Sequence, residues 1–311
     1  MPESPSSPLD PAPAPVWRLG TAEGAGDAPF TVLEVGGLLH PLAALSGGAE
    51  IAVLEILEEW DEWLPRLAAT AASAEAGSAL DPEAISWLPP IRFPGKLIGV
   101  GANYDEHLDE MNTSFDPGFP RAFLKPASTG LVGSGRVVRL PANAQMVDWE
   151  AELAIIIGRR SKHLTGAAVF DAVAGYTAFN DLSARDWVED QVPFLGMDLV
   201  RQKGFDEFGP LGPLITPAEA VGDPQALDLS LTVNGVEKQS ANTKDMTFGV
   251  AAILEHFLSF MTLEPGDVIV TGSPAGVGYG RDPQEFLAGG DEVEVAIERL
   301  GPPLVTRFAA P

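Results

Sequence analysis

Two acidic side chains stand two residues apart at the entry to a strongly apolar segment. Glu150 and Glu152 precede a run of hydrophobic residues that ends at Ile157. A β-strand projects alternate side chains to the same face, so both carboxylates are expected to point the same way. If that face is interior, two like charges in poorly solvated surroundings require a compensating cation. The segment therefore predicts either a divalent-metal site or a solvent-exposed strand end that carries two surface acids.

A third carboxylate, Asp181, follows the apolar residues 172–179, where a dense polar sequence begins. Functional side chains often project from the ends of strands. Three carboxylates that leave positions open for water or substrate match Mg²⁺ or Mn²⁺, which prefer oxygen ligands in octahedral geometry, whereas zinc favours imidazole or thiolate. The alternative interpretation is that Asp181 caps the turn of residues 183–187.

His107 and Glu110 are three residues apart, a spacing that places both on one face of a helix. A carboxylate in that position orients the imidazole and raises its basicity, which suits a general base acting on water. Tyr104, Leu108 and Met111 form an apolar stripe with His107, so a buried structural histidine is the competing interpretation. Core and surface roles suffice for His256 and His163, and His40 lies in the small N-terminal domain near a turn.

Two basic residues and one loop are candidates for binding an anion. Lys203 can hold a carboxylate or a developing oxyanion, and Arg185 can bind a carboxylate in bidentate fashion. Each can equally be a salt-bridge partner in so acidic a chain. The loop of residues 271–278, which contains Gly272, has small residues that let backbone N–H groups approach an anion. It lacks the lysine and spacing of a phosphate loop, so a plain turn is the alternative and nucleotide binding is not expected.

The elements that must position these side chains are mostly strands. Apolar runs separated by turns predict strands at residues 97–100, 122–124, 137–140, 151–157, 172–179, 229–233, 268–271 and 293–297. Helices are predicted at residues 103–112 and 248–261. The regular alternation of strand and helix that a doubly wound sheet needs is absent. The pattern therefore predicts a β-rich α+β fold.

The chain is predicted to have three parts. Residues 1–15 are rich in Pro, Ser and Ala, without the features of a signal peptide, and predict a disordered arm. Residues 16–94 predict a small N-terminal α+β domain with short strands and one amphipathic helix over residues 50–69. Residues 95–311 are predicted to form a larger second domain that carries the candidate catalytic residues.

The composition limits the partners that the protein can have. Lys and Arg total 19 against 44 Asp and Glu, a formal net charge of -25. That field repels nucleic acid and anionic lipid, so neither is an expected partner, and an anionic substrate must meet a local cation. The absence of cysteine excludes disulfides and thiolate zinc sites. No apolar run of about 18 residues supports a membrane span, and a cytoplasmic location is expected.

Five segments, taken together and in this order, resemble the fumarylacetoacetate hydrolase family. They are the run that contains His107 and Glu110 and the residues 148–154, 180–186, 203–213 and 271–278. The resemblance spans about residues 97–308. It implies a mixed β-sandwich roll for the large domain and a homodimer formed through that domain. It also implies that Mg²⁺ or Mn²⁺ is held by Glu150, Glu152 and Asp181.

The resemblance implies catalytic roles as well. His107 and Glu110, on a segment that orders over bound substrate, would activate a water, and Lys203 would help to stabilise the oxyanion. Thr271 and its loop, with Gly272, would hold the carboxylate of the substrate. The expected reaction is hydrolysis of a C–C bond in a small anionic 2-oxo or 1,3-dicarbonyl acid, such as an acylpyruvate or fumarylpyruvate. A metal that chelates two oxygens of such an acid stabilises the departing enolate.

One position departs from the family pattern. Family members commonly carry a glutamine two residues after the position of Asp186, where it assists the oxyanion, and this chain has Val188, with Gln191 out of register. The loss of one preorganised donor can cost several kcal/mol of transition-state stabilisation. A lyase or isomerase reaction (decarboxylation, tautomerisation or dehydration) on the same metal-enolate chemistry is therefore the alternative. A catalytically idle relative that only binds a small acid or serves as a dimeric scaffold is a third interpretation.

Overall fold

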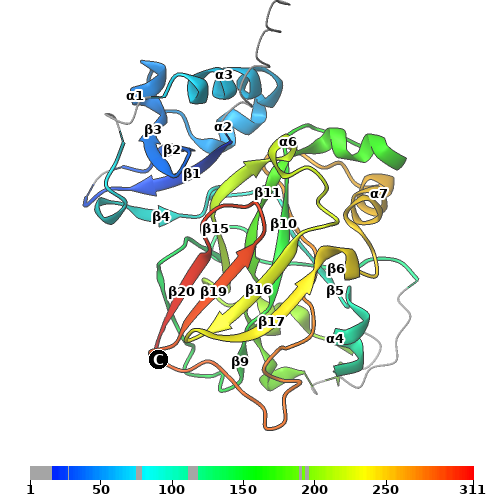
Figure 1. The fold of residues 1–311 in the computed structure, drawn as a ribbon. Helices are drawn as coiled ribbons and strands as arrows, with labels where there is room; N and C mark the ends of the chain where they lie inside the picture. Colours follow the sequence, from blue (N-terminus) through cyan, green and yellow to red (C-terminus); the bar gives the residue numbers. More distant parts are fainter. Residues whose placement is uncertain (1–15, 27, 75–78, 111–117, 189–190, 193–195) are drawn as a thin grey trace, which may run out of the picture.

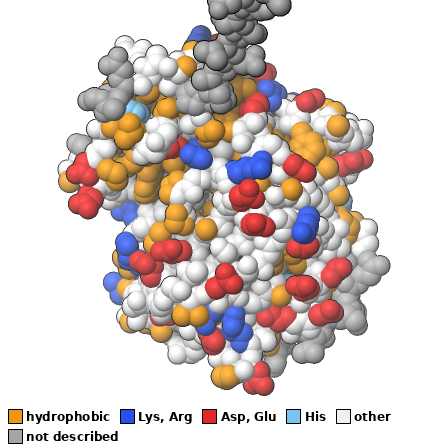
Figure 2. Space-filling model, viewed as in Figure 1, with side chains coloured by type: hydrophobic (Ala, Val, Ile, Leu, Met, Phe, Trp, Pro, Cys, Tyr) orange, Lys and Arg blue, Asp and Glu red, His pale blue; other side chains and the backbone are white. Residues whose placement is uncertain are grey.

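The computed structural model describes residues 16–311 except residues 27, 75–78, 111–117, 189–190 and 193–195. The predicted arm of residues 1–15 therefore lies outside the described residues. Two large sheets form the body of the molecule, and short helices lie around them (Figure 1). The predicted β-rich α+β fold is confirmed. On the face drawn in Figure 2, acidic side chains are scattered over the surface with basic ones between them.

The larger sheet has eleven strands in the order β3-β2-β1-β15-β11-β10-β18-β5-β6, with β4 paired to β1 and β7 paired to β15. Its strands are β1 (Trp17–Glu23), β2 (Phe30–Val35), β3 (Leu38–Pro41), β4 (Ser86–Leu88), β5 (Leu97–Gly101), β6 (Arg121–Leu124), β7 (Leu131–Val132), β10 (Ala151–Ile157), β11 (Val173–Asn180), β15 (Gly209–Pro217) and β18 (Val268–Val270). Because β1 pairs antiparallel with β15, the sheet continues from the N-terminal part into the large domain. The division of the chain near residue 94 stays a prediction.

The smaller sheet has five strands in the order β17-β16-β19-β20-β8, and in Figure 1 it lies in front of β10 and β11. Its strands are β8 (Val137–Arg139), β16 (Asp228–Val233), β17 (Val236–Asn242), β19 (Glu292–Ile297) and β20 (Leu304–Ala309). Two further pairs are β9 (Val147–Asp148) with β12 (Ser183–Ala184), and β13 (Gln191–Val192) with β14 (Gly196–Met197).

The helices are short and peripheral. They are α1 (Leu42–Ser46), α2 (Val53–Glu58), α3 (Trp60–Ala72), α4 (Asp105–Glu110), α5 (Leu199–Lys203), α6 (Ala218–Val221) and α7 (Val250–Phe260). The single helix predicted over residues 50–69 is wrong, because Glu59 leaves the helical region with φ -119° and ψ 38°. The next residue, Trp60, begins α3; it is 2% exposed and its ring centroid lies 6.4 Å from that of Trp17. None of the described helices has the length and hydropathy that crossing a membrane requires.

Strand β10 is the centre of the core, because all seven of its residues are buried. Ile155 and Ile157 pack with residues of the smaller sheet, whereas Ala154 and Ile156 pack with side chains of the N-terminal helices. A strand covered on both faces is expected to be continuously apolar, as this one is. Glu152 also stands at an even-numbered position, so its side chain lies on the same face of the strand as those of Ala154 and Ile156.

Candidate metal centre and active site

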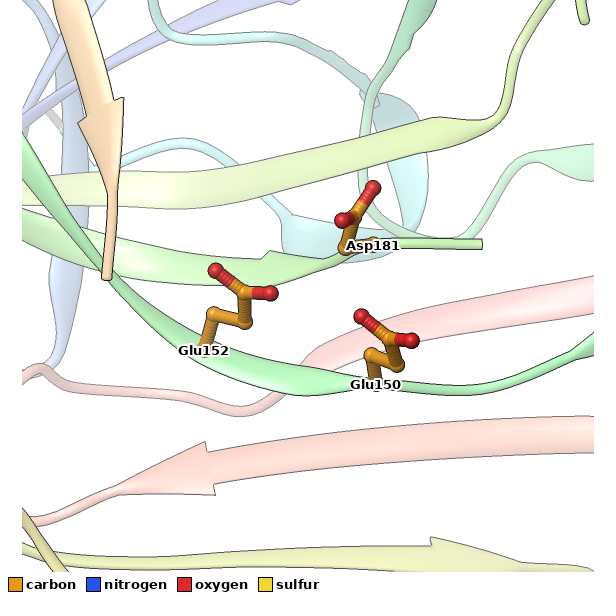
Figure 3. Close-up of side chains that lie close together, drawn as sticks. All are labelled: Glu150, Glu152 and Asp181. Carbon is orange, nitrogen blue, oxygen red and sulfur yellow. The ribbon is translucent and has the colours of Figure 1, made fainter. Parts of the chain in front are cut away.

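Three carboxylates converge where β10 begins and β11 ends. Glu150, Glu152 and Asp181 each offer an oxygen that lies within 4.8 Å of the others (Figure 3). The register that pairs Ala151 with Asn180 places the residue after β11 beside the residue before β10. The three residues are 5%, 1% and 0% exposed, so the interpretation of two surface acids is wrong. The period-two argument and the strand-end position of Asp181 are confirmed.

The donor set fits a hard divalent cation. Glu150, Glu152 and Asp181 supply carboxylate oxygens only, which Mg²⁺ and Mn²⁺ prefer, and imidazole and thiolate are absent from the triad. Three buried carboxylates close together repel one another strongly unless positive charge is near. These three residues would hold the ion.

Two lysine ammonium groups supply positive charge to the triad. The Nζ of Lys203 donates to Glu150 Oε2 at 2.7 Å and also donates to Asp181 Oδ2. The Nζ of Lys125 donates to Asp181 Oδ1 at 2.5 Å. Both ammonium groups are nearly or fully removed from solvent, with side chains 7% and 0% exposed. Lys125 was not predicted; its signal was a lysine that directly continues the apolar segment Ala122–Leu124, one position after β6.

Arg185 is paired with two acids in the structure. Its guanidinium donates to Asp148 Oδ2 at 3.0 Å and to Glu150 Oε1 at 2.5 Å. Asp148 also accepts the backbone N–H of Gly278 at 2.6 Å and that of Tyr279 at 3.0 Å. This network ties the triad to the loop that follows β18, and it occupies the guanidinium that was predicted to bind substrate. That role of Arg185 stays a prediction, whereas its salt-bridge alternative describes what the structure contains.

The loop after β18 directs one backbone donor at the triad itself. The N–H of Gly272 donates to Glu152 Oε2 at 2.7 Å, and the hydroxyl of Thr271 donates to the carbonyl oxygen of Leu153 at 3.1 Å. Gly272 has φ +91°, and a Cβ there would lie 2.8 Å from the Cβ of Asn103, so the tight approach requires glycine. The loop is therefore more than a plain turn. Its predicted contact with the carboxylate of a substrate stays a prediction.

His107 and Glu110 lie on helix α4 and face each other as their spacing predicts. Nδ1 of His107 lies 3.4 Å from Glu110 Oε2, and both side chains are partly buried. Both carboxylate oxygens of Glu110 also accept the N–H of Gly276 at 3.1 Å. Glu110 thus connects α4 to the loop of residues 271–278. The side chain of His107 is 13% exposed, so it is not a fully buried core residue, and its role as a base stays a prediction.

Burial and neighbouring charges separate the pKa values of the two glutamates. Burial raises the pKa of Glu152 well above its ordinary value, and the charges of Asp181 and Glu150 raise it further. Burial acts in the same direction on Glu150, but Lys203 and Arg185 outweigh it and hold the pKa of Glu150 below its ordinary value. Of the two glutamates, Glu152 is therefore the one that retains a proton more readily.

Metal binding is therefore expected to strengthen as the pH rises. An ion must displace the proton that the raised pKa of Glu152 retains, so competition is strongest at low pH and is lost as the pH passes through that pKa. Calorimetric titration with Mg²⁺ or Mn²⁺ in buffers of different ionisation enthalpy measures the released protons. An affinity that is independent of pH, with no proton release, would contradict the expectation.

Val188 lies directly after the 3-10 turn of residues Arg185–Trp187 and is partly exposed. Its apolar side chain cannot donate a hydrogen bond to an oxyanion, whatever its orientation. The side chain of Gln191 lies outside the described residues. Val188 therefore cannot supply the hydrogen bond that the family's usual glutamine would donate.

Comparison with known proteins supports the same assignment. The family model described as "Fumarylacetoacetate (FAA) hydrolase C-terminal" matches residues 96–307. The human protein named oxaloacetate tautomerase FAHD2B, mitochondrial, is 42% identical over 217 residues, which are 70% of this chain and 68% of that protein. A solved fumarylacetoacetate hydrolase from Exiguobacterium antarcticum has a TM-score of 0.79 and 32% identity, over 95% of this chain and 100% of that one.

A second solved structure is maleylpyruvate hydrolase from Sphingobium sp. SYK-6 in complex with manganese(II) and pyruvate. It has a TM-score of 0.74 and 26% identity, and the match covers 94% of this chain and 99% of that one. The family model covers well over half of the chain and includes all five segments that carry the resemblance. Sequence, fold and the arrangement of the triad agree: the chain belongs to the fumarylacetoacetate hydrolase family.

Proposed function

We propose that the protein is a divalent-metal-dependent enzyme that enolises a small anionic 2-oxo acid. We further propose that its reaction is keto–enol tautomerisation of a 2-oxo dicarboxylate of the oxaloacetate type. The observation that carries the proposal is the convergence of Glu150, Glu152 and Asp181 within 4.8 Å in a buried site. A bound Mg²⁺ or Mn²⁺ would polarise the 2-oxo group and acidify the adjacent C–H bond.

The side chains around the triad suit a proton transfer. Tautomerisation moves one proton from C3 of the substrate to its carbonyl oxygen, with no atom gained or lost. His107 is the candidate base, because Glu110 faces its Nδ1 and leaves Nε2 for the substrate. The Lys203 ammonium would face the oxygen on which negative charge develops. Helix α4, which Glu110 connects to Gly276, would shield this transfer from bulk water.

Tautomerisation is preferred to hydrolysis because of Val188. Hydrolysis adds water to a second carbonyl and creates a second oxyanion, which needs its own hydrogen-bond donor. The family's usual glutamine would supply that donor, and a valine cannot. Tautomerisation creates only the enolate at the 2-oxo group. The name of the human relative, an oxaloacetate tautomerase, agrees with this preference.

Hydrolysis of a C–C bond in an acylpyruvate-like or fumarylpyruvate-like acid is the second candidate. Its support is the His107–Glu110 pair, which is equally suited to activating a water, and the maleylpyruvate hydrolase among the structural neighbours. The two reactions can be distinguished by their products. Only hydrolysis transfers ¹⁸O from water into a new product carboxylate, whereas tautomerisation changes the enol absorbance of oxaloacetate without forming a second product.

Replacing His107 by alanine is expected to lower kcat for either reaction by about 10²- to 10⁴-fold, because the proton-transfer group is lost. The measurement is the rate of enol conversion with Mg²⁺ present. A chelator-treated sample gives the background rate without metal. Mn²⁺ affinity, followed by calorimetry, should change little, because His107 is not a member of the triad. Full retention of activity in His107→Ala would remove the assigned role.

We also propose a homodimer formed through the large domain. Strand β6 ends the larger sheet among the described strands, and beside it Phe119 stacks on His256 at 5.4 Å while 45% exposed. An exposed aromatic cluster at a sheet edge is typical of a subunit contact. A mass in solution of twice 32.7 kDa by light scattering would support the dimer, and a mass of one chain would refute it.

A further inference from the structure

The Lys203 ammonium lies between two of the three carboxylates that are proposed to bind metal. Its Nζ donates to Glu150 Oε2 at 2.7 Å and also to Asp181 Oδ2. A single cation thereby bridges side chains from the two sides of the site, one before β10 and one after β11. A divalent ion that used the same two oxygens would have to occupy the space where the ammonium lies, because two cations cannot share it.

Lys125 contacts the triad differently, although it carries the same charge. Its Nζ donates only to Asp181 Oδ1, at 2.5 Å, and to the carbonyl oxygen of Leu182, at 3.4 Å. The side chain is 0% exposed and follows strand β6 of the larger sheet. It contacts one carboxylate and bridges none, so an ion that joined Glu150 to Asp181 through the two oxygens that Lys203 contacts would not compete with Lys125 for position.

The two lysines also differ in the elements that carry them. Lys203 is the last residue of α5, a peripheral helix of five residues on which Val200 is 65% exposed. Lys125 directly follows β6, which is hydrogen-bonded to β5 along its whole length, and its own side chain is 0% exposed. A short peripheral helix rearranges at lower cost than a segment held in a sheet ladder, because fewer interactions must break. The ammonium of Lys203 is therefore the one that can withdraw.

The balance of charge changes sign when an ion enters. Four buried carboxylates lie in the network, those of the triad and of Asp148, and three cations face them, Lys125, Lys203 and Arg185. At full ionisation the network is one positive charge short. A divalent ion makes it one positive charge in excess, and that excess favours an incoming anion.

We propose that Lys203 holds the place of the divalent ion in the protein without metal, and that metal binding releases its ammonium towards the anionic substrate. Lys125 remains on Asp181 as the permanent counter-ion. The inference rests on the proposed function, since it requires that the triad binds metal. The inference predicts that the metal binds before the substrate. The metal would create the anion site both by its own charge and by releasing the Lys203 ammonium.

The test compares two lysine variants that remove equal charge. Protein stripped with chelator is titrated with Mn²⁺ by calorimetry as wild type, Lys203→Met and Lys125→Met. We expect Lys203→Met to bind Mn²⁺ about tenfold more tightly, because the competing cation is gone. Lys125→Met should bind Mn²⁺ no more tightly than wild type, because it loses a donor that orients a ligand carboxylate.

A second titration with oxalate, an unreactive dianion, is made with Mn²⁺ present. Lys203→Met should bind oxalate more weakly than wild type while binding the metal more tightly, and a purely structural lysine would not produce these opposite signs. Should Lys203→Met fail to fold, Lys203→Gln keeps neutral donors and carries the same comparison, with Lys125→Gln as its match.

The outcomes separate the inference from the proposed function. Unchanged or weaker Mn²⁺ affinity in the Lys203 variant would overturn the exchange. Equal tightening in both lysine variants would also overturn it, because simple removal of charge would then explain the result. A wild-type protein that binds no Mn²⁺ would instead refute the proposed function.

Discussion

Asp181→Asn is expected to abolish tight binding of Mg²⁺ and Mn²⁺ and to lower kcat/KM by about 10³-fold or more, since metal-ion catalysis supplies several kcal/mol. The amide keeps the shape of the side chain but removes its charge. Lys125 and Lys203 would then face a neutral group, and their positive charges would repel an incoming ion. Calorimetry measures the metal affinity, and enol conversion of oxaloacetate measures the rate.

The matched control for this prediction is Asp267→Asn. Asp267 is also fully buried and also accepts from a lysine, Lys96, at 2.8 Å, but it lies outside the triad. The control variant is expected to lose stability and to keep its metal affinity. Comparable loss of metal binding in both variants would mean that Asp181 acts through folding, and retained metal affinity in Asp181→Asn would remove it from the ligand set.

Arg185→Met is expected to destabilise the protein by about 3–5 kcal/mol, the usual effect of removing one partner of a buried ion pair. Its guanidinium forms salt bridges with Asp148 at 3.0 Å and with Glu150 at 2.5 Å, and both acids are buried. Without it, two carboxylates lose a charged partner in poorly solvated surroundings. Urea unfolding in the presence of chelator measures the change in the free energy of unfolding.

Arg159→Met provides the control for this second prediction. Arg159 also pairs with an aspartate, Asp61, at 2.6 Å, but the side chain of Asp61 is 74% exposed. Exposed pairs contribute about 0–1 kcal/mol, so this variant should unfold almost as the wild type does. An equally small effect of Arg185→Met would show that the buried network contributes little to stability.

The parts of the site that follow from strand periodicity could be predicted from the sequence. Strand β10 has the predicted bounds Ala151–Ile157, and the period of two placed Glu150 and Glu152 on one face. Asp181 stands at the end of β11 as expected, and the helical spacing of His107 and Glu110 brought them together. Each of these inferences needs only local geometry, which the order of residues determines directly.

The contacts between distant segments could not be predicted in this way. Lys125 meets Asp181 across 56 positions of the chain, and Arg185 meets Asp148 across 37. These contacts depend on how strands pair and on how loops close, and local sequence patterns do not reveal either. Lys125 stands in an apolar context and has no polar neighbour that marks a site.

Strand β15 was missed for a different reason. Its sequence from Gly209 to Pro217 contains two glycines and three prolines, which are typical of turns, yet all nine residues are buried. Pairing with β11 on one side and β1 on the other supplies the interactions that overcome its poor strand propensity. The break at Glu59 was also missed, because the apolar spacing of residues 50–69 continues through it.

The most direct test is a titration with Mn²⁺ followed by electron paramagnetic resonance, for wild type and for Asp181→Asn. The proposed function predicts one bound ion per chain in the wild type, a spectrum that changes when pyruvate is added, and no bound ion in the variant. A wild-type chain that leaves Mn²⁺ free in solution, or a variant that binds it equally well, would contradict a metal centre built from Glu150, Glu152 and Asp181.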